Sequence, residues 1–228
     1  MNEVLWFGML IACFFTVILA FRLFGKLGLY MWIAVSVIVA NIQVLKTIEI
    51  FSFTTTLGNI VYASSFLATD ILSENFGKKD ARRGVFIGFF SLLSMTLFMN
   101  IALVFRPAPG DFAHGPLKSI FGMMPRIAGA SMAAYLLSQL HDIWAYHFWK
   151  SRFPADRSIW LRNNASTMVS QLIDTSVFTF AAFTGVFPFS VVMQIFFTTY
   201  IMKWIVAALD TPFIYWSKRM RPPADTGG

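Results

Sequence analysis

Two short polar stretches interrupt long apolar segments of this sequence. Gln139 and Asp142 lie in one stretch, and Gln171 and Asp174 repeat the same amide and acid, three residues apart, in the other. Residues at positions i and i+3 share one face of a helix, so each pair projects in one direction. An acid inside a membrane costs about 2.5–3.5 kcal/mol on insertion scales, which makes it a candidate functional residue. A carboxamide beside a carboxylate offers hydrogen-bond acceptors and donors in a planar array, which suits the edge of a guanine-like base.

Helix geometry places both acids near the middle of a membrane. At a rise of about 1.5 Å per residue, Asp142 lies about 12 Å from Lys150, and Asp174 lies about 18 Å from Arg162, in a hydrocarbon core about 30 Å thick. Earlier segments carry further amides and acids near this level, and an aromatic ring for stacking. The expected binding residues are Asn41, Gln43, Tyr62, Asp70, Gln139, Asp142, Gln171 and Asp174.

Three basic residues within the expected helices are candidates for gating or charge pairing. Lys203 is too deep to reach the interface easily, so we expect it to pair with Asp142 or Asp174. Lys46 and Arg126 lie toward the outer ends of their helices, where Arg126 either guards the entrance or extends to the interface. A single amide or serine is better explained by a hydrogen bond between helices, worth about 0.6 kcal/mol. Two acids at matched depth favour a site.

The composition is typical of an integral membrane protein. The 228 residues are 57% hydrophobic and 13% charged, and apolar segments follow one another almost from end to end. We expect one membrane domain, residues 1–217, and a polar tail, residues 218–228. The net charge of +7 does not indicate a nucleic-acid partner, because the basic residues fall in loops between helices. Membrane lipid is the expected surrounding partner.

Sequence motifs for catalysis or metal binding are missing. Cys13 is the only cysteine, which excludes a disulfide within the chain and a cysteine-type zinc site. The sequence contains neither the glycine-rich phosphate loop of ATPases nor the HExxH motif of zinc proteases. We therefore expect no enzyme, no cofactor and no bound metal.

Hydropathy predicts an all-α fold, a polytopic bundle of transmembrane helices. Most of the 18 lysine and arginine residues fall in alternate loops, which predicts an outer N-terminus and a cytoplasmic C-terminus. An arrangement with six spans, in which the first or second apolar segment lies otherwise, stays open. The seven expected spans are residues 5–24, 31–50, 56–76, 85–105, 125–150, 165–187 and 190–216.

Three segments, residues 41–46, 56–79 and 160–175, resemble the queuosine precursor transporter family, and the segment 56–79 is the most specific. This resemblance implies uptake of 7-cyano-7-deazaguanine and 7-aminomethyl-7-deazaguanine across a bacterial inner membrane. It also implies a relation to vitamin uptake transporters and, more distantly, to the substrate-binding subunits of energy-coupling-factor importers. The alternative function is capture of a substrate for such an importer, which needs a separate ATPase module.

The resemblance gives the polar residues candidate roles. Asp142 or Asp174 would accept hydrogen bonds from the ring N–H and the exocyclic amine of the base, while an aromatic ring stacks on it. The carbonyl and pyrrole edge of the base would meet the amides Asn41, Gln43, Gln139 and Gln171. Gly129 and Ala133 form a small-residue surface that allows close helix packing, so a homodimer is also expected as an option.

Overall fold

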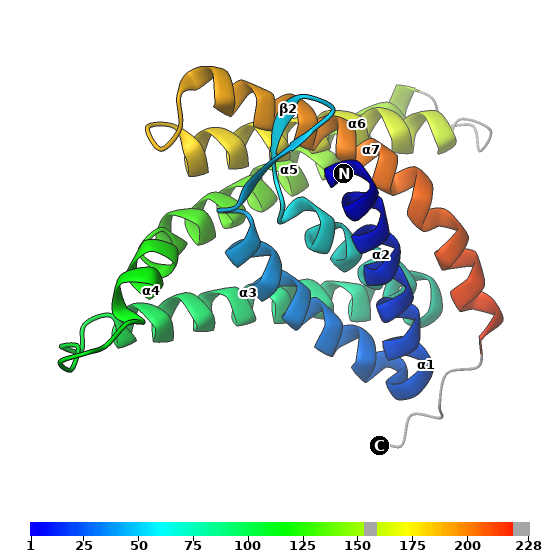
Figure 1. Ribbon diagram of the computed structural model, residues 1–228. Coiled ribbons are helices and arrows are strands. Elements are labelled where there is room, and N and C mark those ends of the chain that lie inside the picture. Colours follow the sequence, from blue (N-terminus) through cyan, green and yellow to red (C-terminus); the bar gives the residue numbers. More distant parts are fainter. Residues whose placement is uncertain (153–158, 221–228) are drawn as a thin grey trace. The chain divides into compact units, whose positions relative to one another are not determined.

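The computed structural model describes residues 1–152 and 159–220, which are mostly helical (Figure 1). Four helical stretches in these residues are long and apolar enough to cross a membrane, which agrees with the expected polytopic membrane protein. A two-stranded antiparallel sheet departs from the expected all-α fold. The elements are α1 (Asn2–Gln43), β1 (Thr47–Ile50), β2 (Phe53–Thr56), α2 (Asn59–Phe76), α3 (Lys78–Ala102), α4 (His114–Phe121), α5 (Met124–Arg152), α6 (Ile159–Phe183) and α7 (Phe189–Arg219).

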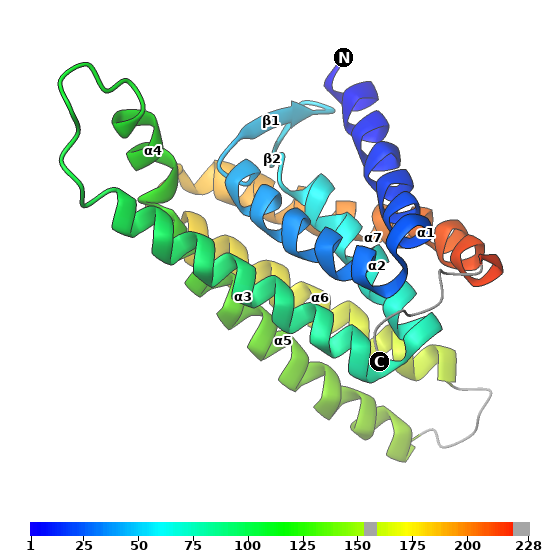
Figure 2. The same cartoon turned by 90° about the horizontal axis from the view of Figure 1, so that it is seen from below.

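Helix α1 contains the first expected span and most of the second. Its backbone leaves helical geometry at Gly25, where φ is 57° and ψ is −136°, a conformation that glycine adopts readily. The chain reverses direction at this residue, so α1 has a first leg, residues 2–24, and a second leg, residues 26–43 (Figure 2). The legs meet closely, because a Cβ added to Gly28 would lie 2.1 Å from the carbonyl oxygen of Ala20.

The expected helix over residues 31–50 is wrong at its C-terminal end, where the chain forms a β-hairpin. Strand β1 pairs antiparallel with β2, so that Thr47 lies opposite Thr56 and Ile50 lies opposite Phe53. Strand β2 contains three threonines, and β1 contains one threonine and two isoleucines. The branched Cβ of these residues favours extended backbone. A helix is expected from residue 56, whereas α2 begins at Asn59.

Other boundaries also differ from the sequence-based expectation. Helix α3 begins at Lys78, so the basic stretch that is expected as a loop forms its first turns instead. Its residues are mostly good helix formers, and Asp80 in the first turn suits the positive end of the helix dipole. The break between α2 and α3 is confined to Gly77, whose φ is 90°. The region between the expected spans 85–105 and 125–150 contains the short helix α4.

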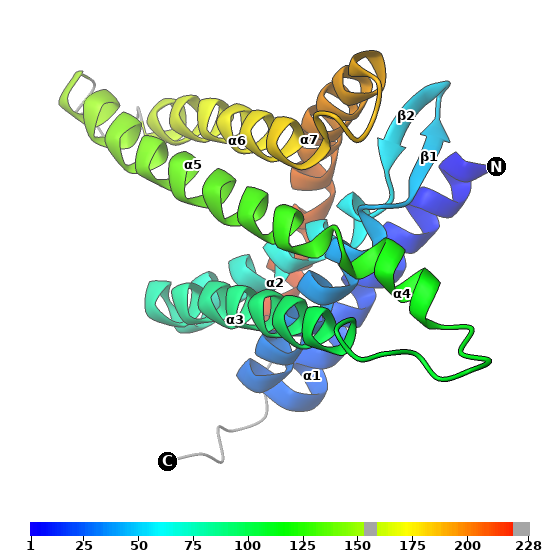
Figure 3. The ribbon, with the colours of Figure 1, turned by 90° about the vertical axis from the view of Figure 1, so that its left-hand side faces the viewer.

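The described residues pack into two compact units. Unit 1 contains Met1–Pro125 and the described residues from Ile201 onward, and unit 2 contains the described residues of Arg126–Tyr200. The core of unit 1 joins both legs of α1, α2 and the second part of α7. Its fully buried side chains include Phe14, Phe21, Leu67 and Ile71. In unit 2, α5 and α6 run side by side (Figure 3).

Contacts at the two ends of unit 1 agree with the expected order of loops. At the end that contains the kink of α1, Lys26 Nζ lies 3.8 Å from Asp80 Oδ2, and Tyr30 donates to Asp80 Oδ1 at 2.7 Å. Lys218 Nζ lies 2.5 Å from Glu74 Oε2 at the same ends of α7 and α2. The start of α1 contacts the hairpin instead. Basic residues that the sequence assigns to one side therefore do meet at one end of unit 1.

Candidate functional site

The second leg of α1 ends in two of the expected binding residues. Asn41 is buried, and its Nδ2 donates to the carbonyl oxygen of Val37 at 2.7 Å within the helix. Gln43 Oε1 is shielded from solvent and has no hydrogen-bond partner among the described residues. The start of α2 packs closely on this end of the leg, because a Cβ added to Gly58 would lie 2.3 Å from the Ala40 carbonyl oxygen. A shielded carbonyl without a partner costs about 1–3 kcal/mol, so Gln43 is a candidate acceptor for a ligand.

Tyr62 and Asp70 lie on one face of α2, as their spacing predicts. The opposite face of α2 carries the buried residues that enter the core of unit 1, among them Leu67 and Ile71. Asp70 is exposed, and Tyr62 is half-buried with its ring centroid 5.0 Å from that of Phe66. Within unit 1, apolar side chains occupy the core side of α2, so the face that carries Tyr62 and Asp70 does not point into that core.

The serine and threonine content of α2 is largely satisfied inside the helix. Ser65 and Thr69 each donate to the carbonyl oxygen three residues earlier, at 2.6 and 2.8 Å. Ser64 does the same and also accepts a hydrogen bond from Trp32 Nε1 at 3.0 Å. Such local bonds let a polar helix lie in a membrane without a ligand. The interpretation of single serines as structural residues therefore fits this helix.

The expected polar pairs of unit 2 lie on α5 and α6. The side chains of Gln139 and Asp142 lie outside the described residues. On α6, Gln171 Oε1 is shielded and has no partner among the residues that the structure describes, and Asp174 is half-buried and takes part in an interaction. The amide of Gln171 thus offers a second candidate acceptor.

A contact between α5 and α6 fixes their register at this level. His141 Nδ1 lies 3.1 Å from the hydroxyl of Ser170, which is buried. His141 is one residue before Asp142, and Ser170 is one residue before Gln171, so the two polar stretches are level with each other, as depth counting predicts.

The three basic candidates have different surroundings. Arg126 donates from Nε to the carbonyl oxygen of Ala181 at 2.8 Å and from Nη2 to that of Thr184 at 2.5 Å. These bonds cap the C-terminal end of α6, where cations are favoured, and gating by Arg126 stays a prediction. Lys46 is exposed in the turn before β1. Lys203 is half-buried and takes part in an interaction, and its pairing with a particular acid stays a prediction.

The structure adds polar groups that the sequence does not single out. Trp6, Thr55, Thr96 and Thr179 each have a shielded polar atom without a hydrogen-bond partner in the described part of the chain. Periodicity carries no signal for such atoms, because their state depends on neighbours from other elements. The expected small-residue surface makes no close helix contact within the described chain, since a Cβ on Gly129 would meet no atom within 4 Å. The homodimer stays a prediction.

A family model described as "Putative vitamin uptake transporter" matches residues 56–217. The chain belongs to the vitamin uptake transporter family. A Bacillus subtilis protein named "Probable queuosine precursor transporter" is 43% identical over 97% of this chain and 96% of its own length. The "Queuosine precursor transporter" of Escherichia coli is 31% identical over 63% of this chain and 62% of its own length. No solved structure matches the chain.

Family membership confirms three expectations. The family resemblance is confirmed, and the chain is a transporter and not an enzyme. It is a multi-pass membrane protein with bacterial relatives. The family model begins at Thr56, whereas the similarity to the Bacillus subtilis protein includes almost the whole chain. Helix α1 and strand β1 therefore belong to the shared protein, although they precede the family model.

Proposed function

We propose that this protein imports the queuosine precursors 7-cyano-7-deazaguanine and 7-aminomethyl-7-deazaguanine across a bacterial inner membrane. The observation that carries this proposal is the 43% identity, over 97% of the chain, to a protein named as a queuosine precursor transporter. The "Queuosine precursor transporter" of Escherichia coli is 31% identical, and the "Probable queuosine precursor transporter" of Haemophilus influenzae is 30% identical.

The unpartnered amide oxygens support a ligand that is rich in N–H groups. A deazaguanine base presents N–H donors on its pyrimidine ring, its exocyclic amine and its pyrrole ring, and a carbonyl acceptor beside them. In unit 1, Gln43 Oε1 would accept one such donor, the amide of Asn41 would serve the carbonyl, and Tyr62 would stack on the ring. Asp70, which is exposed, would attract the aminomethyl group of the second precursor by its charge.

Unit 2 offers its own set of groups. Gln171 Oε1 would accept from the base in the same way as Gln43. Asp142 or Asp174 would accept from the ring N–H and the exocyclic amine together, and Gln139 would serve the pyrrole edge. Each unit would contact the base at its own step of transport, and each set can be tested by substitution without reference to the other.

The charge distribution of unit 1 supports an orientation. Lys26, Arg83 and Lys218 lie at the kinked end of α1 and at the neighbouring ends of α3 and α7, where they meet Asp80 and Glu74. Positively charged ends face the cytoplasm in most membrane proteins. The C-terminus would then be cytoplasmic and the hairpin would face outward, with six to seven spans related to those of energy-coupling-factor substrate-binding subunits.

The test is uptake of labelled 7-cyano-7-deazaguanine by bacteria that cannot make it. Cells that express this chain are expected to accumulate label and to restore queuosine in tRNA, and cells with an empty vector are not. Equal uptake in both strains would contradict the proposal. Purified chain in liposomes separates transport by this protein alone from capture for an importer with its own ATPase, because only the first function predicts uptake by the lone chain.

A further inference from the structure

Three shielded polar atoms lie at the hairpin end of unit 1, which we define by the start of α1, the end of its second leg, β1 and β2. They are Trp6 Nε1, Gln43 Oε1 and Thr55 Oγ1, and none has a hydrogen-bond partner among the described residues. The whole side chains of Trp6 and Thr55 are shielded as well, with exposures of 3% and 1%. The three residues come from separate parts of the sequence, so local helix geometry does not explain why their polar atoms are unpaired.

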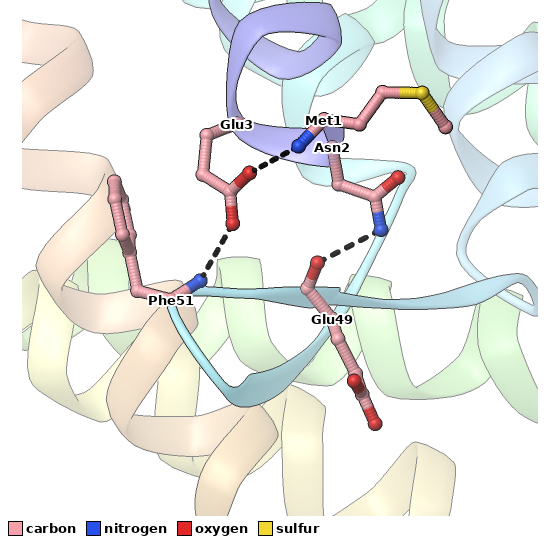
Figure 4. A network of polar contacts seen from close by, with 5 residues as sticks. All are labelled: Met1, Asn2, Glu3, Glu49 and Phe51. Atoms are coloured by element: carbon pink, nitrogen blue, oxygen red, sulfur yellow. Dashed lines mark hydrogen bonds and ion pairs between the residues drawn. The ribbon is translucent and has the colours of Figure 1, made fainter.

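Two hydrogen bonds join the start of α1 to the hairpin (Figure 4). Asn2 Nδ2 donates to the carbonyl oxygen of Glu49 at 2.9 Å, and Glu3 Oε1 accepts from the backbone N–H of Phe51 at 3.1 Å. Trp6 lies one helical turn after these two residues and belongs to the same buried cluster as Ile50 of β1. The Trp6 side chain therefore enters the same core as Ile50 of the hairpin.

The strand register places Thr55 on that same side. Thr55 lies opposite Ile48, and residues 48, 50, 53 and 55 share one face of the hairpin because side chains alternate along a strand. Ile48 and Ile50 of this face pack into the cluster that contains Trp6. Thr55 therefore lies on the same side of the hairpin as Ile48 and Ile50, and this side faces the core.

Gln43 enters this end of unit 1 from the second leg of α1. The backbone carbonyl oxygen of Gln43 accepts from the backbone N–H of Lys46 at 3.0 Å. The backbone carbonyl oxygen of Lys46 in turn accepts from the N–H of Leu57, just after β2, at 2.8 Å. The close approach of Gly58 to Ala40 fixes α2 against the same turn. The end of the second leg is therefore joined to the base of the hairpin, where Thr55 lies.

The chemistry of these atoms is complementary to one edge of a heteroaromatic base. An indole N–H only donates, an amide oxygen only accepts, and a hydroxyl does either. Buried polar groups in native proteins are nearly always paired, so three unpaired atoms at one end of a unit indicate partners that the chain does not supply. A planar base carries donors and acceptors that suit each of these three kinds of atom, whereas a lipid chain carries neither.

We propose that the hairpin end of unit 1 is a subsite for the transported base, where Trp6 donates to the ring, Gln43 accepts from it, and the Thr55 hydroxyl binds its edge. This inference rests on the proposed function, because it takes a deazaguanine as the ligand. Trp6 and Thr55 are specificity-determining residues on this account, and the hairpin is part of the binding site.

The experiment measures binding of 7-cyano-7-deazaguanine to the purified full chain in lipid nanodiscs. Thr55→Val removes the hydroxyl and keeps the size of the side chain, and Trp6→Phe removes the N–H donor. Thr96→Val is the matched control, because Thr96 on α3 also has a shielded hydroxyl without a partner in the described chain but lies outside the hairpin end. The unfolding temperature without ligand is measured for every variant.

Thr55→Val and Trp6→Phe are expected to raise the Kd about tenfold, as loss of one hydrogen bond predicts, while Thr96→Val binds like the unchanged protein. Thr55→Val is also expected to unfold at the same or a higher temperature without ligand, because an unpaired buried hydroxyl is removed. Equal binding by Thr55→Val and Thr96→Val would overturn the subsite, even if both shift the unfolding temperature. If the unchanged chain neither binds nor imports the probe, the proposed function fails, and the subsite fails with it. If Trp6→Phe does not fold, Thr55→Val decides.

Discussion

Gln171→Leu separates a binding role from a structural role at the polar stretch of α6. Gln171 Oε1 is shielded without a partner among the described residues, so its lost hydration, about 1–3 kcal/mol, is not offset in the unliganded protein. Leucine has a similar size and no polar group. We expect the unliganded variant to unfold at a higher temperature, by about 2–4 °C for each kcal/mol recovered. Binding of 7-cyano-7-deazaguanine is expected to weaken about tenfold, or about 1.4 kcal/mol, because a base N–H loses its acceptor.

The assay is thermal unfolding of the purified chain across a concentration series of the base. Gln194→Leu on α7 is the matched control, because Gln194 is also half-buried in unit 2 but takes part in an interaction. That variant is expected to lose stability and to keep its affinity for the base. The reasoning is refuted if Gln171→Leu binds the base as tightly as the unchanged protein, or if it loses as much stability as Gln194→Leu.

Three further predictions concern the scaffold. Gly28→Ala forces a Cβ against the backbone oxygen of Ala20, so we expect a loss of at least about 1–3 kcal/mol, measured by thermal unfolding. The pKa of Glu3, which precedes the first apolar segment, is lowered to about 2. A hydrogen bond from the backbone N–H of Glu3 is the largest cause, and the terminal amine and the Phe51 N–H also lower this pKa. Because the folded pKa is depressed, the stabilisation by Glu3 is present above the unfolded pKa of about 4.3 and is lost as the pH falls through about 2. Glu3→Gln should therefore speed hydrogen exchange of the Phe51 amide at neutral pH. Arg126→Gln should lower stability by about 1 kcal/mol through loss of the α6 cap, with the KM for uptake unchanged.

Each scaffold prediction has its own control. Gly8→Ala should leave stability unchanged or raise it, because a Cβ there meets no atom within 4 Å; a loss equal to that of Gly28→Ala would contradict the close packing of the two legs. Asn2→Asp removes the side-chain N–H that donates to the Glu49 carbonyl oxygen. At neutral pH it should speed hydrogen exchange in the hairpin, as Glu3→Gln does. A change in the KM of Arg126→Gln at unchanged stability would favour gating over capping.

Long apolar segments predict most of the helices, because hydropathy and period are local properties of the sequence. The kink at Gly25 falls between the expected spans 5–24 and 31–50, because the apolar pattern is interrupted there. The hairpin is different. Its residues lie in a stretch that mixes apolar and polar side chains, and a strand becomes stable only when its partner, here β2 for β1, is in place. A helix pattern that continues past Gln43 therefore predicts too long a span.

The candidate site was predictable only where polar residues interrupt an apolar helix. Gln171 and Asp174 stand out on this ground, and so do Asn41 and Gln43. Trp6 does not, because an indole in an apolar helix looks like any other large apolar residue until its neighbours show that the N–H is unpaired. The direction of the polar face of α2 was equally hidden, since spacing tells which residues share a face and not which neighbour covers it.

The most direct test of the central claim is uptake of labelled 7-cyano-7-deazaguanine by cells that cannot make it, with the unchanged chain, Gln171→Leu and Gln194→Leu expressed at equal levels in the membrane. We predict uptake by the unchanged chain and by Gln194→Leu at low external concentrations, and a KM raised about tenfold for Gln171→Leu. Uptake no greater than in cells with an empty vector would contradict the account.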